Sequence, residues 1–413
     1  MLTNYLKVAL KVLGRRKFFT FISLFGISLT LVVLMVAAAI LDNVFAPRQP
    51  ESRFDRVLGL YVFGMYGPNG GITSSPGYKF LDRYVRGLPS AEKTSLFTSQ
   101  SPIVMYHDGR KVETHLRRTD GAYWQILDLQ FLEGGPFTEQ DNQNASFVAV
   151  ITDDMRRKLY GDVPAVGKTL DVDGQRFRVV GVVPPVSITR LAAFSEIWAP
   201  VRTLKSSDYE RQMFGNFAAI VQARSRADFP KLRSEFEQRM AHFVFDDPKT
   251  YNRVEAGLDT PFELAARSMV GNDAKVDRAT TLRLIILLAA LLFVTLPTMN
   301  LISINLSRIM ERASEIGVRK AFGASSRALI GQFVMENVLL TIVGGAIGFV
   351  LSLVALDALT RIEIIPYAIF EVNLRIFAYG MLIAALFGII SGVYPAWRMS
   401  RMNPVNALRG GAA

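Results

Sequence analysis

The sequence predicts an α-helical membrane protein with four transmembrane helices and a large α/β extracytoplasmic domain inserted between the first and second helices. Half of its 413 residues are hydrophobic, which is typical of a chain with membrane segments rather than of one large soluble domain. Four stretches of 19 to 24 residues carry no charge: 18–41, 284–306, 338–356 and 376–397. Each is long enough to cross a hydrocarbon core at ~1.5 Å per residue.

The distribution of charge predicts which side of the membrane each segment faces. Three short segments, 1–17, 307–327 and 398–413, carry 13 basic and 2 acidic residues and so account for the whole net charge of +11. The 242 residues of 42–283 carry 32 basic and 30 acidic residues. Basic residues on short flanks mark the cytoplasmic side, so both termini are expected inside and 42–283 outside. The basic composition therefore indicates topology and not a nucleic-acid partner.

These patterns divide the chain into nine segments. The first is expected to be a helix along the inner membrane surface, because its apolar and basic residues occupy opposite faces; contact with a partner protein is the alternative. The first apolar stretch is expected to remain as an anchor, since it exceeds the ~7–15 apolar residues of a signal peptide. The segments are a cytoplasmic amphipathic helix (1–17), transmembrane helix 1 (18–41), the outer domain (42–283), transmembrane helix 2 (284–306), a cytoplasmic segment (307–327), transmembrane helix 3 (328–356), a short outer loop (357–373), transmembrane helix 4 (374–397) and a cytoplasmic tail (398–413).

The outer domain is predicted to mix strands and helices. Its size is sufficient for a core of its own, in one lobe or in two. "FVAVIT" (147–152) is an apolar strand, and Thr152 with the two acids after it predicts the start of a short helix ending near Gly161. "TLDVDGQRFRVVGVV" alternates around an Asp-Gly pair, the strongest short signal for a hairpin. A further helix is expected over 228–243.

The stretch "GDVPAVGKTL" (161–170) looks like a phosphate-binding loop, but two features argue against that function. Five residues separate Gly161 from Gly167, where the motif requires four. A hairpin follows, whereas a phosphate site needs the N-terminus of a helix. The glycines and Lys168 are therefore expected in an exposed turn, and no nucleotide site is expected in this chain.

The sequence carries no catalytic or metal-binding motif. It contains no cysteine, which excludes disulfides, thiol catalysis and cysteine-ligated metals. The three histidines, His107, His115 and His242, lack the spacing of a metal site and are expected at the surface. There is also no G-x-S-x-G elbow. An enzyme is therefore not expected.

One acidic residue stands at the start of the third expected transmembrane helix, in "GQFVMEN". An ionisable residue at that place is a functional candidate by default. Alternatively, Glu336 reaches the headgroups or pairs with Arg327 or Lys320 near the inner interface. The sequence favours neither reading.

Small residues recur at intervals of four in two of the expected transmembrane helices. They are Gly344 and Gly348 in the third, and Ala384, Gly388 and Gly392 in the fourth. This spacing lets helix backbones approach closely in lipid, so we expect packing against another helix, in this chain or in a second copy. The general abundance of glycine in membrane helices is the alternative.

Three stretches closely resemble the MacB/FtsX-type permeases of ABC transporters, a family that works by mechanotransmission (type VII). They are the run from "RIMERASEIGVRKAFGASSR" through "GGAIGF" (308–349), the ending "GVYPAWRMSRMNPVNALRG" (392–410) and "TDGAYWQILDLQFLEGGPFTEQD" (119–141). The last is similar to the MacB periplasmic core domain. The resemblance covers the N-terminal helix, the four apolar stretches and the middle of the outer domain; 190–275 is less distinctive.

The resemblance implies a pair of permeases, formed by two copies or by a paralogue, with two cytoplasmic ABC ATPases docked beneath them. Unlike MacB itself, this chain is expected to have no fused nucleotide-binding domain. ATP and Mg are therefore expected to bind a separate partner, and this chain is expected to bind no cofactor. The segment 307–327 would couple to that ATPase. Its charged side chains make this segment too polar to be buried in lipid. Glu315 lies four positions before Arg319, a spacing that supports a helix. Two glycines allow another backbone to approach closely or the chain to turn. The expected coupling residues are Arg312, Glu315, Ile316, Gly317, Arg319, Lys320 and Gly323; a loop that merely enforces topology is the alternative.

The expected function is that of a permease subunit in the bacterial inner membrane, which passes ATPase motion to its periplasmic domain and so drives efflux or extraction of a drug, peptide or lipoprotein. The alternative is an FtsX-like signalling protein that regulates cell-envelope enzymes. An outer domain of 242 residues favours the first, because it exceeds the size of a small regulatory domain. The substrate stays open, as does the participation of a periplasmic adaptor and an outer-membrane channel.

Overall fold

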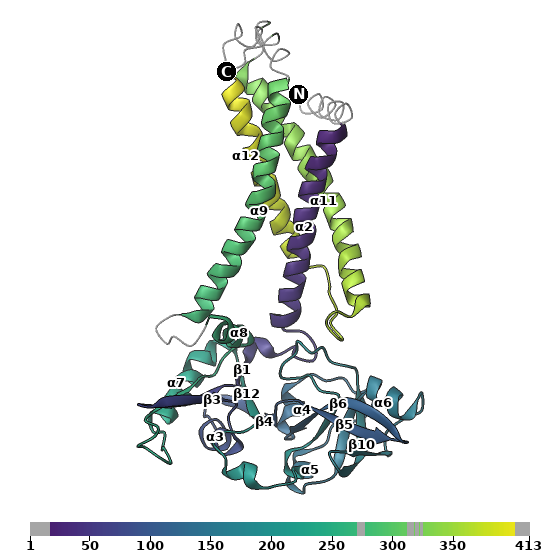
Figure 1. Cartoon of the computed structure of the whole chain (residues 1–413), viewed down its shortest axis with the longest axis vertical. Helices are drawn as coiled ribbons and strands as arrows, with labels where there is room; N and C mark the ends of the chain where they lie inside the picture. Colours follow the sequence, from purple (N-terminus) through teal and green to yellow (C-terminus); the bar gives the residue numbers. More distant parts are fainter. Residues whose placement is uncertain (1–16, 271–276, 312–317, 319–321, 323–324, 401–413) are drawn as a thin grey trace. The chain divides into compact units, whose positions relative to one another are not determined.

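The chain forms two compact units (Figure 1): 1–42, 282–364 and 369–413 make up the helical unit, and 43–281 and 365–368 the outer domain. The structure, a computed structural model, describes residues 17–270, 277–311, 318, 322 and 325–400. The predicted amphipathic helix at 1–17 therefore lies almost wholly outside the described residues, and its orientation stays a prediction.

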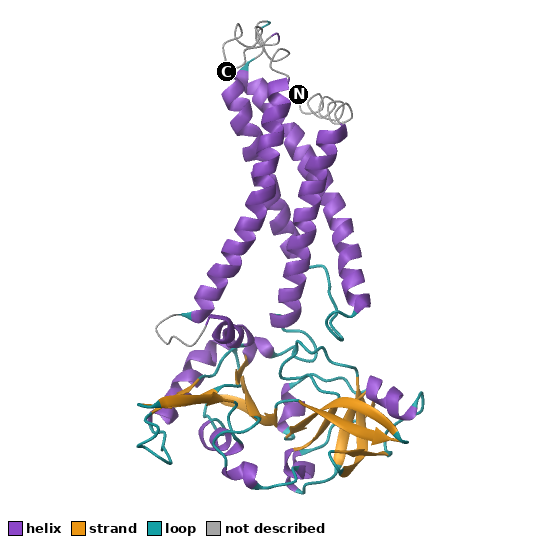
Figure 2. Ribbon diagram, viewed as in Figure 1, coloured by secondary structure: helices purple, strands orange, loops and turns teal. Residues whose placement is uncertain are grey.

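Long helices make up the helical unit (Figure 2): α2 Lys17–Phe45, α9 Arg278–Glu311, α11 Ser326–Ile362 and α12 Leu374–Ser400. Each contains one of the four charge-free stretches. In the part of the chain that is described, two helical segments are long and apolar enough to cross a membrane, Lys17–Phe45 and Val334–Ile362. Helix α11 continues six residues past its expected end, through the first part of the predicted outer loop.

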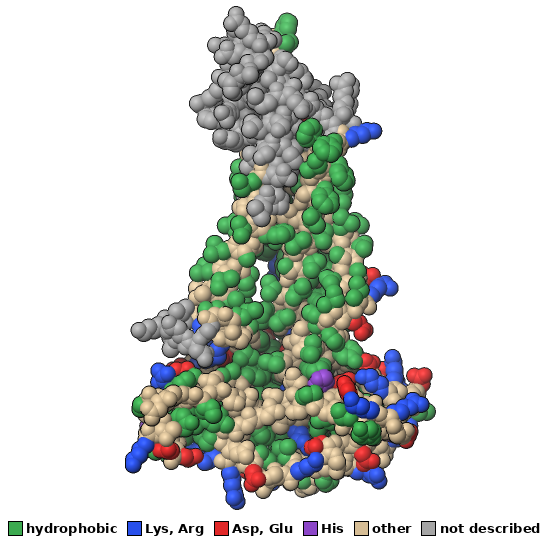
Figure 3. Space-filling model, in the orientation of Figure 1, with side chains coloured by type: hydrophobic (Ala, Val, Ile, Leu, Met, Phe, Trp, Pro, Cys, Tyr) green, Lys and Arg blue, Asp and Glu red, His purple; other side chains and the backbone are tan. Residues whose placement is uncertain are grey.

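The apolar side chains of these helices face outward to a large extent. In the most apolar 18-residue stretch of each helix, only 28% of the stretch is buried in α2 and 33% in α11. Figure 3 shows hydrophobic side chains over the visible face of the helices, while charged side chains gather on the outer domain. A core helix of a soluble protein would bury most of its apolar residues, so this exposure is typical of helices that contact lipid.

The outer domain mixes strands with short helices, as predicted. Its strands are β1 Val57–Leu60, β2 Phe63–Gly67, β3 Gly70–Ser74, β4 Ala91–Thr98, β5 Ser101–His107, β6 Arg110–Thr119, β7 Glu133–Gly134, β8 Val148–Thr152, β9 Thr169–Val172, β10 Gln175–Val183, β11 Ile197–Pro200, β12 Phe217–Ala223 and β13 Arg253–Ala256. Its helices are η1 Phe54–Arg56, α3 Tyr78–Tyr84, α4 Ala122–Ile126, α5 Glu139–Gln143, α6 Asp153–Tyr160, η2 Val201–Thr203, η3 Asp208–Arg211, η4 Arg226–Asp228, α7 Phe229–Ala241 and α8 Pro261–Val270.

One continuous sheet joins two lobes. Its order is β1-β12-β4-β6-β11-β8-β10-β7, with β5 on β6 and β9 on β10, while β13-β2-β3 form a small separate sheet. Strands β1, β12 and β4 pair extensively, but β4 meets β6 only at Phe97 and Thr119. We call β1, β12 and β4 with α3 and α7 the first lobe, and β5 to β11 with α4 to α6 the second lobe. The place where β4 meets β6 is the seam.

Each lobe has its own apolar core, and a third core crosses the seam. Phe63, Phe80 and Phe236 lie in the first lobe's core, and Phe177 lies in the second's. The shared core contains Val57 and Phe97 from the first lobe and Tyr123, Val150 and Trp198 from the second. Burial of large apolar side chains is the main stabilising contribution in such a domain, so the shared core holds the lobes together where backbone pairing is sparse.

The local predictions for the outer domain are confirmed. Thr152 caps α6 by accepting a hydrogen bond from the backbone N–H of Met155, and Gly161 ends the helix with a φ of +69°. The hairpin β9–β10 turns at Asp173 and Gly174, whose φ angles are +53° and +67°. Positive φ at both central residues is what the tight hairpin turn requires. Helix α7 lies within the predicted 228–243.

Candidate functional site

The seven predicted coupling residues all lie outside the described residues. They belong to the segment between α9 and α11, in which 312–317, 319–321 and 323–324 lie outside the described residues. Their role therefore stays a prediction.

The glycines of α11 lie against α2. A Cβ placed on Gly344 would stand 3.0 Å from Cβ of Ile27, and one on Gly348 would stand 3.2 Å from the backbone of Ser28. The hydroxyl of Ser28 donates to the carbonyl of Gly344 over 2.8 Å. A side chain at either position would be tightly crowded, and the small size of glycine lets the two helices come close enough for a polar contact between them.

Helix α12 also lies against α11 through a glycine. A Cβ on Gly388 would stand 2.7 Å from the hydroxyl of Thr341, and the Phe349 and Phe377 rings lie 4.8 Å apart. Ala384 is half-buried, and Gly392 lies in α12 where surroundings are not described.

Glu336 is buried, with 6% of its surface exposed, and it accepts a hydrogen bond from the amide of Gln332 over 3.1 Å. Both residues belong to α11 and lie one helical turn apart. This contact neither assigns a function to Glu336 nor tests the alternative pairing with Arg327 or Lys320, because the side chains of those two are not described.

The loop 161–168 is a turn and not a cradle for phosphate. The N–H of Lys168 donates to the carbonyl of Ala165 over 3.0 Å, and the carbonyl of Lys168 accepts from Val179 of the following strand. Lys168 is half-buried, which corrects the expectation of an exposed side chain. Its ammonium lies 4.8 Å from the centre of the Tyr160 ring, a cation–π contact that partly covers the lysine stem.

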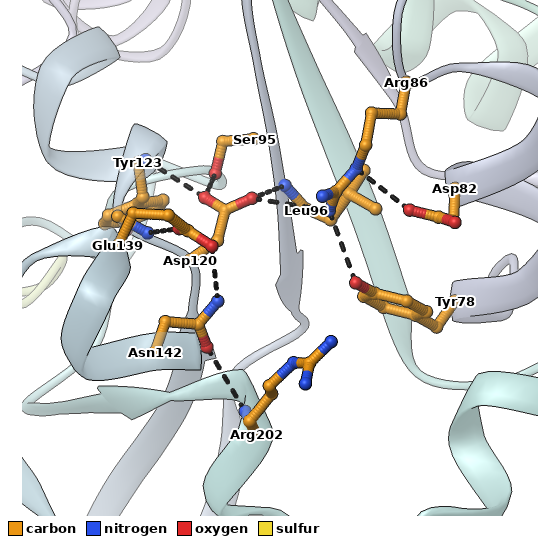
Figure 4. Close-up of polar contacts among 11 residues, drawn as sticks. Tyr78, Asp82, Arg86, Ser95, Leu96, Asp120, Tyr123, Glu139, Asn142 and Arg202 are labelled. Carbon is orange, nitrogen blue, oxygen red and sulfur yellow. Dashed lines mark hydrogen bonds and ion pairs between the residues drawn. The ribbon is translucent and has the colours of Figure 1, made fainter. Parts of the chain in front are cut away.

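A buried carboxylate occupies the seam. Asp120, 5% exposed, follows β6 and accepts hydrogen bonds from the Ser95 hydroxyl (2.6 Å) and the Leu96 N–H (2.9 Å) of β4. It also accepts from the N–H of Tyr123 at the start of α4 (3.2 Å). Figure 4 shows Asp120 between β4 and α4, with Arg86 of the first lobe beyond Leu96. The carboxylate thus ties the two lobes by side-chain bonds at the point where backbone pairing is thinnest.

Burial raises the pKa of Asp120 to about 6, although the hydrogen bonds from Leu96 and Ser95 and the charge of Arg86, 3.9 Å away, oppose this shift. Removal of a carboxylate from water disfavours its charged form. Asp120 can therefore take up a proton in weakly acidic conditions. All its described contacts are internal to the domain, which is typical of a structural group.

A second polar link continues from Asp120 across α5 (Figure 4). Glu139 accepts from the N–H of Gly121 over 2.8 Å and from the amide of Asn142 over 3.1 Å. The amide oxygen of Asn142 in turn accepts from the N–H of Arg202 over 3.3 Å. The chain of bonds fixes α4, α5 and η2 to one another.

Two adjacent arginines of β6 are also buried. Arg117 donates to the carbonyls of Ala192 (2.6 Å) and Leu191 (3.0 Å), and its guanidinium lies 4.9 Å from the centre of the Phe97 ring. Arg118 donates to Asp173 over 2.9 Å, at the turn of the β9–β10 hairpin. Sequence reasoning missed Arg117, Arg118 and Asp120, because most of their partners lie 20 to 85 residues away along the chain.

The histidines do not form a site. His242 is exposed, while His107 and His115 are half-buried, which corrects the expectation that all three lie at the surface. His115 lies 3.3 Å from the carboxylate of Glu196, which Lys158 also contacts. Among the residues that the structure describes, no group of three or more metal-ligating side chains occurs.

Comparison with known proteins places the two parts of the chain in named families. Residues 20–239 match the MacB-like periplasmic core domain, and residues 284–404 match the FtsX-like permease C-terminal domain. The first match covers more than half of the chain and the second covers most of the helical unit.

Individual relatives are similar along most of the chain. It is 26% identical over 329 residues to the uncharacterized ABC transporter permease YknZ of Bacillus subtilis, covering 79% of this chain and 77% of that protein. It is 24% identical over 410 residues to the macrolide export ATP-binding/permease protein MacB of Escherichia coli K12, covering 98% of this chain and 60% of the relative. This chain thus matches less than two thirds of that MacB.

A solved structure, the periplasmic region of MacB from Actinobacillus actinomycetemcomitans, aligns with a TM-score of 0.36 at 15% identity, covering 53% of this chain and 94% of the other. Both family matches occur in the order that the sequence predicts, the periplasmic core domain before the permease C-terminal domain. The chain belongs to the MacB/FtsX-type permeases of ABC transporters.

Proposed function

We propose that this chain is the permease subunit that carries motion from a cytoplasmic ABC ATPase through the inner membrane to its own periplasmic domain. The observation that supports this most is the joint match to a periplasmic core domain and to an FtsX-like C-terminal domain in one chain. In this proposal the outer domain does mechanical work on a substrate held in the periplasm or in the membrane, such as a drug, peptide or lipoprotein.

The proposed topology has four spans, with both termini and 307–327 in the cytoplasm. It rests on the charge asymmetry of the short flanks. The chain is free of cysteine, so single cysteines can report the side of each segment. Ser307→Cys and Ser206→Cys should react with an impermeant thiol reagent from opposite sides of the membrane, and labelling from the same side would refute the topology.

ATP and Mg are proposed to bind the partner ATPase and not this chain. The permease YknZ, of which this chain covers 77%, supports a division of labour between permease and ATPase chains. Purification in mild detergent followed by mass spectrometry should recover an ABC ATPase and reveal whether the second permease is identical. Recovery of cell-envelope hydrolases without a transport partner would favour the FtsX-like signalling role instead.

The coupling segment is tested by charge reversal. In the double variant Arg319→Glu, Lys320→Glu, we expect weaker docking of the ATPase or ATP hydrolysis that no longer drives transport, because opposite charges would face the docked surface. The matched control is Arg110→Glu, Lys111→Glu, two exposed residues of β6, which should leave both unchanged. Normal complex yield together with normal transport in the first variant would contradict the coupling role.

A further inference from the structure

A cavity of about 480 Å³ lies in the outer domain between helix α8, strands β1 and β12, and the loop at 189–192. Its size falls within the range of ~300–1,000 Å³ that is common for small-molecule sites. Most of its wall is apolar, formed by Val44, Phe45, Phe54, Val57, Tyr61, Leu191, Ala192, Ile220, Pro261, Leu264 and Ala265. The space thus suits a compact apolar body.

Two segments that flank the outer domain in the sequence contribute to this wall. Phe45 is the last residue of α2, and its ring meets that of Phe262 in α8 edge-to-face, with centroids 5.2 Å apart. Helix α8 precedes α9 in the chain. The cavity wall therefore includes residues from both sequence ends of the outer domain, Val44 and Phe45 at one end and α8 at the other.

Tyr61 supplies a polar group with no partner of its own. Its ring lies over Gly59, where any side chain would overlap it. Among the residues that the structure describes, no hydrogen-bond partner of the Tyr61 hydroxyl is found. Tyr61 is half-buried and lines the cavity, so its hydroxyl can bond either to water or to a ligand.

Glu51 supplies a carboxylate beside it. Glu51 is 4% exposed, lies 3.6 Å from the guanidinium of Arg190 and accepts from the N–H of Ala193 over 3.2 Å. Burial nevertheless raises the pKa of Glu51 to about 7, because the Arg190 charge does not fully offset the loss of water. Burial first, and then the Glu51 charge, raise the pKa of Tyr61, which places the two groups in each other's electrostatic field.

The charged residues of the cavity wall share one sign. Glu51 and Asp259 line it, whereas no lysine or arginine does, and Asp259 is already paired with Arg267 over 2.8 Å. Both acids have an arginine nearby, Arg190 at 3.6 Å from Glu51 and Arg267 at 2.8 Å from Asp259, but neither arginine lines the wall. The carboxylates are therefore the charges nearest to a ligand, which favours a cation over an anion. Glu51, whose ionised form is only partly compensated, is the group that gains most from a bound cation.

We propose that this cavity binds a compact apolar molecule that carries an amine, with the ammonium beside the Glu51 carboxylate, the Tyr61 hydroxyl as a hydrogen-bond acceptor, and the apolar body against α8 and β12. Asp259 stays with Arg267. Because the ligand would touch Phe45 and α8, its presence would stiffen the contact between the two connecting segments. The inference concerns binding by the outer domain and does not depend on the proposed transport function.

The test uses the full chain in detergent with one introduced cysteine. Ser268, an exposed residue of α8 at the cavity wall, is changed in Ser268→Cys, and the rate of reaction with a water-soluble thiol reagent is measured. The probes are 1-adamantylamine, 1-adamantanol and 1-adamantanecarboxylate, which share one apolar cage and differ in charge. We expect the amine to slow the reaction several-fold at concentrations where the alcohol is weaker and the carboxylate has no effect.

Variants assign the effect to the two polar groups. On the Ser268→Cys background, Tyr61→Phe keeps the ring and removes the hydroxyl, and should raise the amine concentration for half protection by about 3-fold or more. Glu51→Gln should abolish the preference of amine over alcohol, whereas Glu237→Gln, an exposed acid of α7 away from this cavity, should not change it. Unchanged labelling without ligand shows that each variant keeps its fold.

Two outcomes would overturn the proposal. Equal protection by all three probes would show an apolar cavity without selectivity for an amine, and no protection by any would show that the cavity does not bind this class. Ser206→Cys, far from the cavity wall in sequence and not among its lining residues, must label at one rate with all probes. Neither outcome bears on ATPase docking or transport, so failure here is distinguishable from failure of the proposed function.

Discussion

In the outer domain, large side chains are among the fully buried residues: Trp198, Tyr123 and Phe177 have no exposed surface. In the helical unit the closest approaches involve glycine, with Gly344 and Gly348 of α11 against α2. The two regions therefore achieve close packing by opposite means. Large apolar side chains gain free energy by leaving water, but that gain is absent between helices in lipid, where only close contact stabilises.

This contrast teaches that size changes should act in opposite directions in the two regions. Shortening a side chain should harm the outer domain, and lengthening one should harm the helices. The exposed apolar residues of the helical unit agree with this difference. Phe21 and Leu382 are 66% exposed, and an apolar side chain that lipid surrounds loses no free energy by being exposed. The following variants test the contrast, beginning with the largest expected effect.

Trp198→Ala should destabilise the outer domain by about 3–5 kcal/mol, the range for loss of a large buried aromatic side chain. The change removes one large side chain of the shared core and the 3.2 Å hydrogen bond that the Trp198 indole donates to the Tyr123 hydroxyl. Urea denaturation of the full chain in detergent, followed by proteolysis of the outer domain, measures the effect. Tyr106→Ala, at a side chain 68% exposed, should change it by less than about 0.5 kcal/mol; similar losses in both variants would refute the contrast.

Gly348→Leu should destabilise the helical unit by about 1–3 kcal/mol, the range for overpacking. The new side chain would collide with Ser28 and Leu31 of α2, whose atoms stand 3.2 Å from its Cβ position. Ala346→Leu, two residues away on the exposed side of α11, is the matched control. The midpoint of thermal aggregation in detergent should fall for the first variant alone, and equal midpoints would show that small size at 348 is not needed.

The contribution of Asp120 to the stability of the outer domain should fall as pH rises from about 4 to 6. Asp120 has a folded-state pKa of about 6, above its ordinary value of 3.8, so the folded state holds a proton that the unfolded state has already lost. The stabilisation is complete below pH 3.8 and absent above pH 6, a difference of about 2–3 kcal/mol. Glu51 acts in the same direction up to pH 7.

Asp120→Asn should therefore flatten, but not abolish, the decline between pH 4 and 6 in urea midpoints. Asp108→Asn, at a side chain 89% exposed, should show the same dependence of the urea midpoint on pH as the wild type. A difference in midpoint between wild type and Asp120→Asn that stays constant over this interval would mean that the Asp120 charge carries no burial cost in the folded state, contrary to the burial argument.

Lys168→Ala should have the smallest effect. Loss of the contact with the Tyr160 ring removes about 0.5–1 kcal/mol at most, and ATP hydrolysis by the assembled complex should be unchanged because 161–168 is a turn before a hairpin. Purified complexes of wild type and variant with equal ATPase rates would agree with this. ATP binding by the chain that disappears with Lys168 would restore the nucleotide interpretation.

The elements that could be predicted from the sequence are those specified by neighbours in the chain. Thr152 and Gly161 mark the ends of α6, and Asp173-Gly174 marks the hairpin, because caps and tight turns depend on a few adjacent residues. Burial of Asp120 and Arg117 could not be predicted, because it follows from strands that meet after folding. The half-buried state of Lys168 was missed for the same reason, since the position of the Tyr160 ring depends on how α6 packs. The family resemblance, in contrast, rested on long matched runs and is confirmed.

Helix α11 has 37 residues, which gives a length of about 55 Å at ~1.5 Å per residue. A hydrocarbon core is only about 30 Å thick, so close to half of this helix has no lipid tails to meet. Asp357 and Arg361, joined by an ion pair of 2.7 Å, mark where its apolar run gives way to residues that prefer water. A bilayer a few ångströms thicker or thinner would change which turns are covered without stretching or compressing the helix. The energetic cost of such a mismatch is set by the length of the apolar run and not by the full length of the helix.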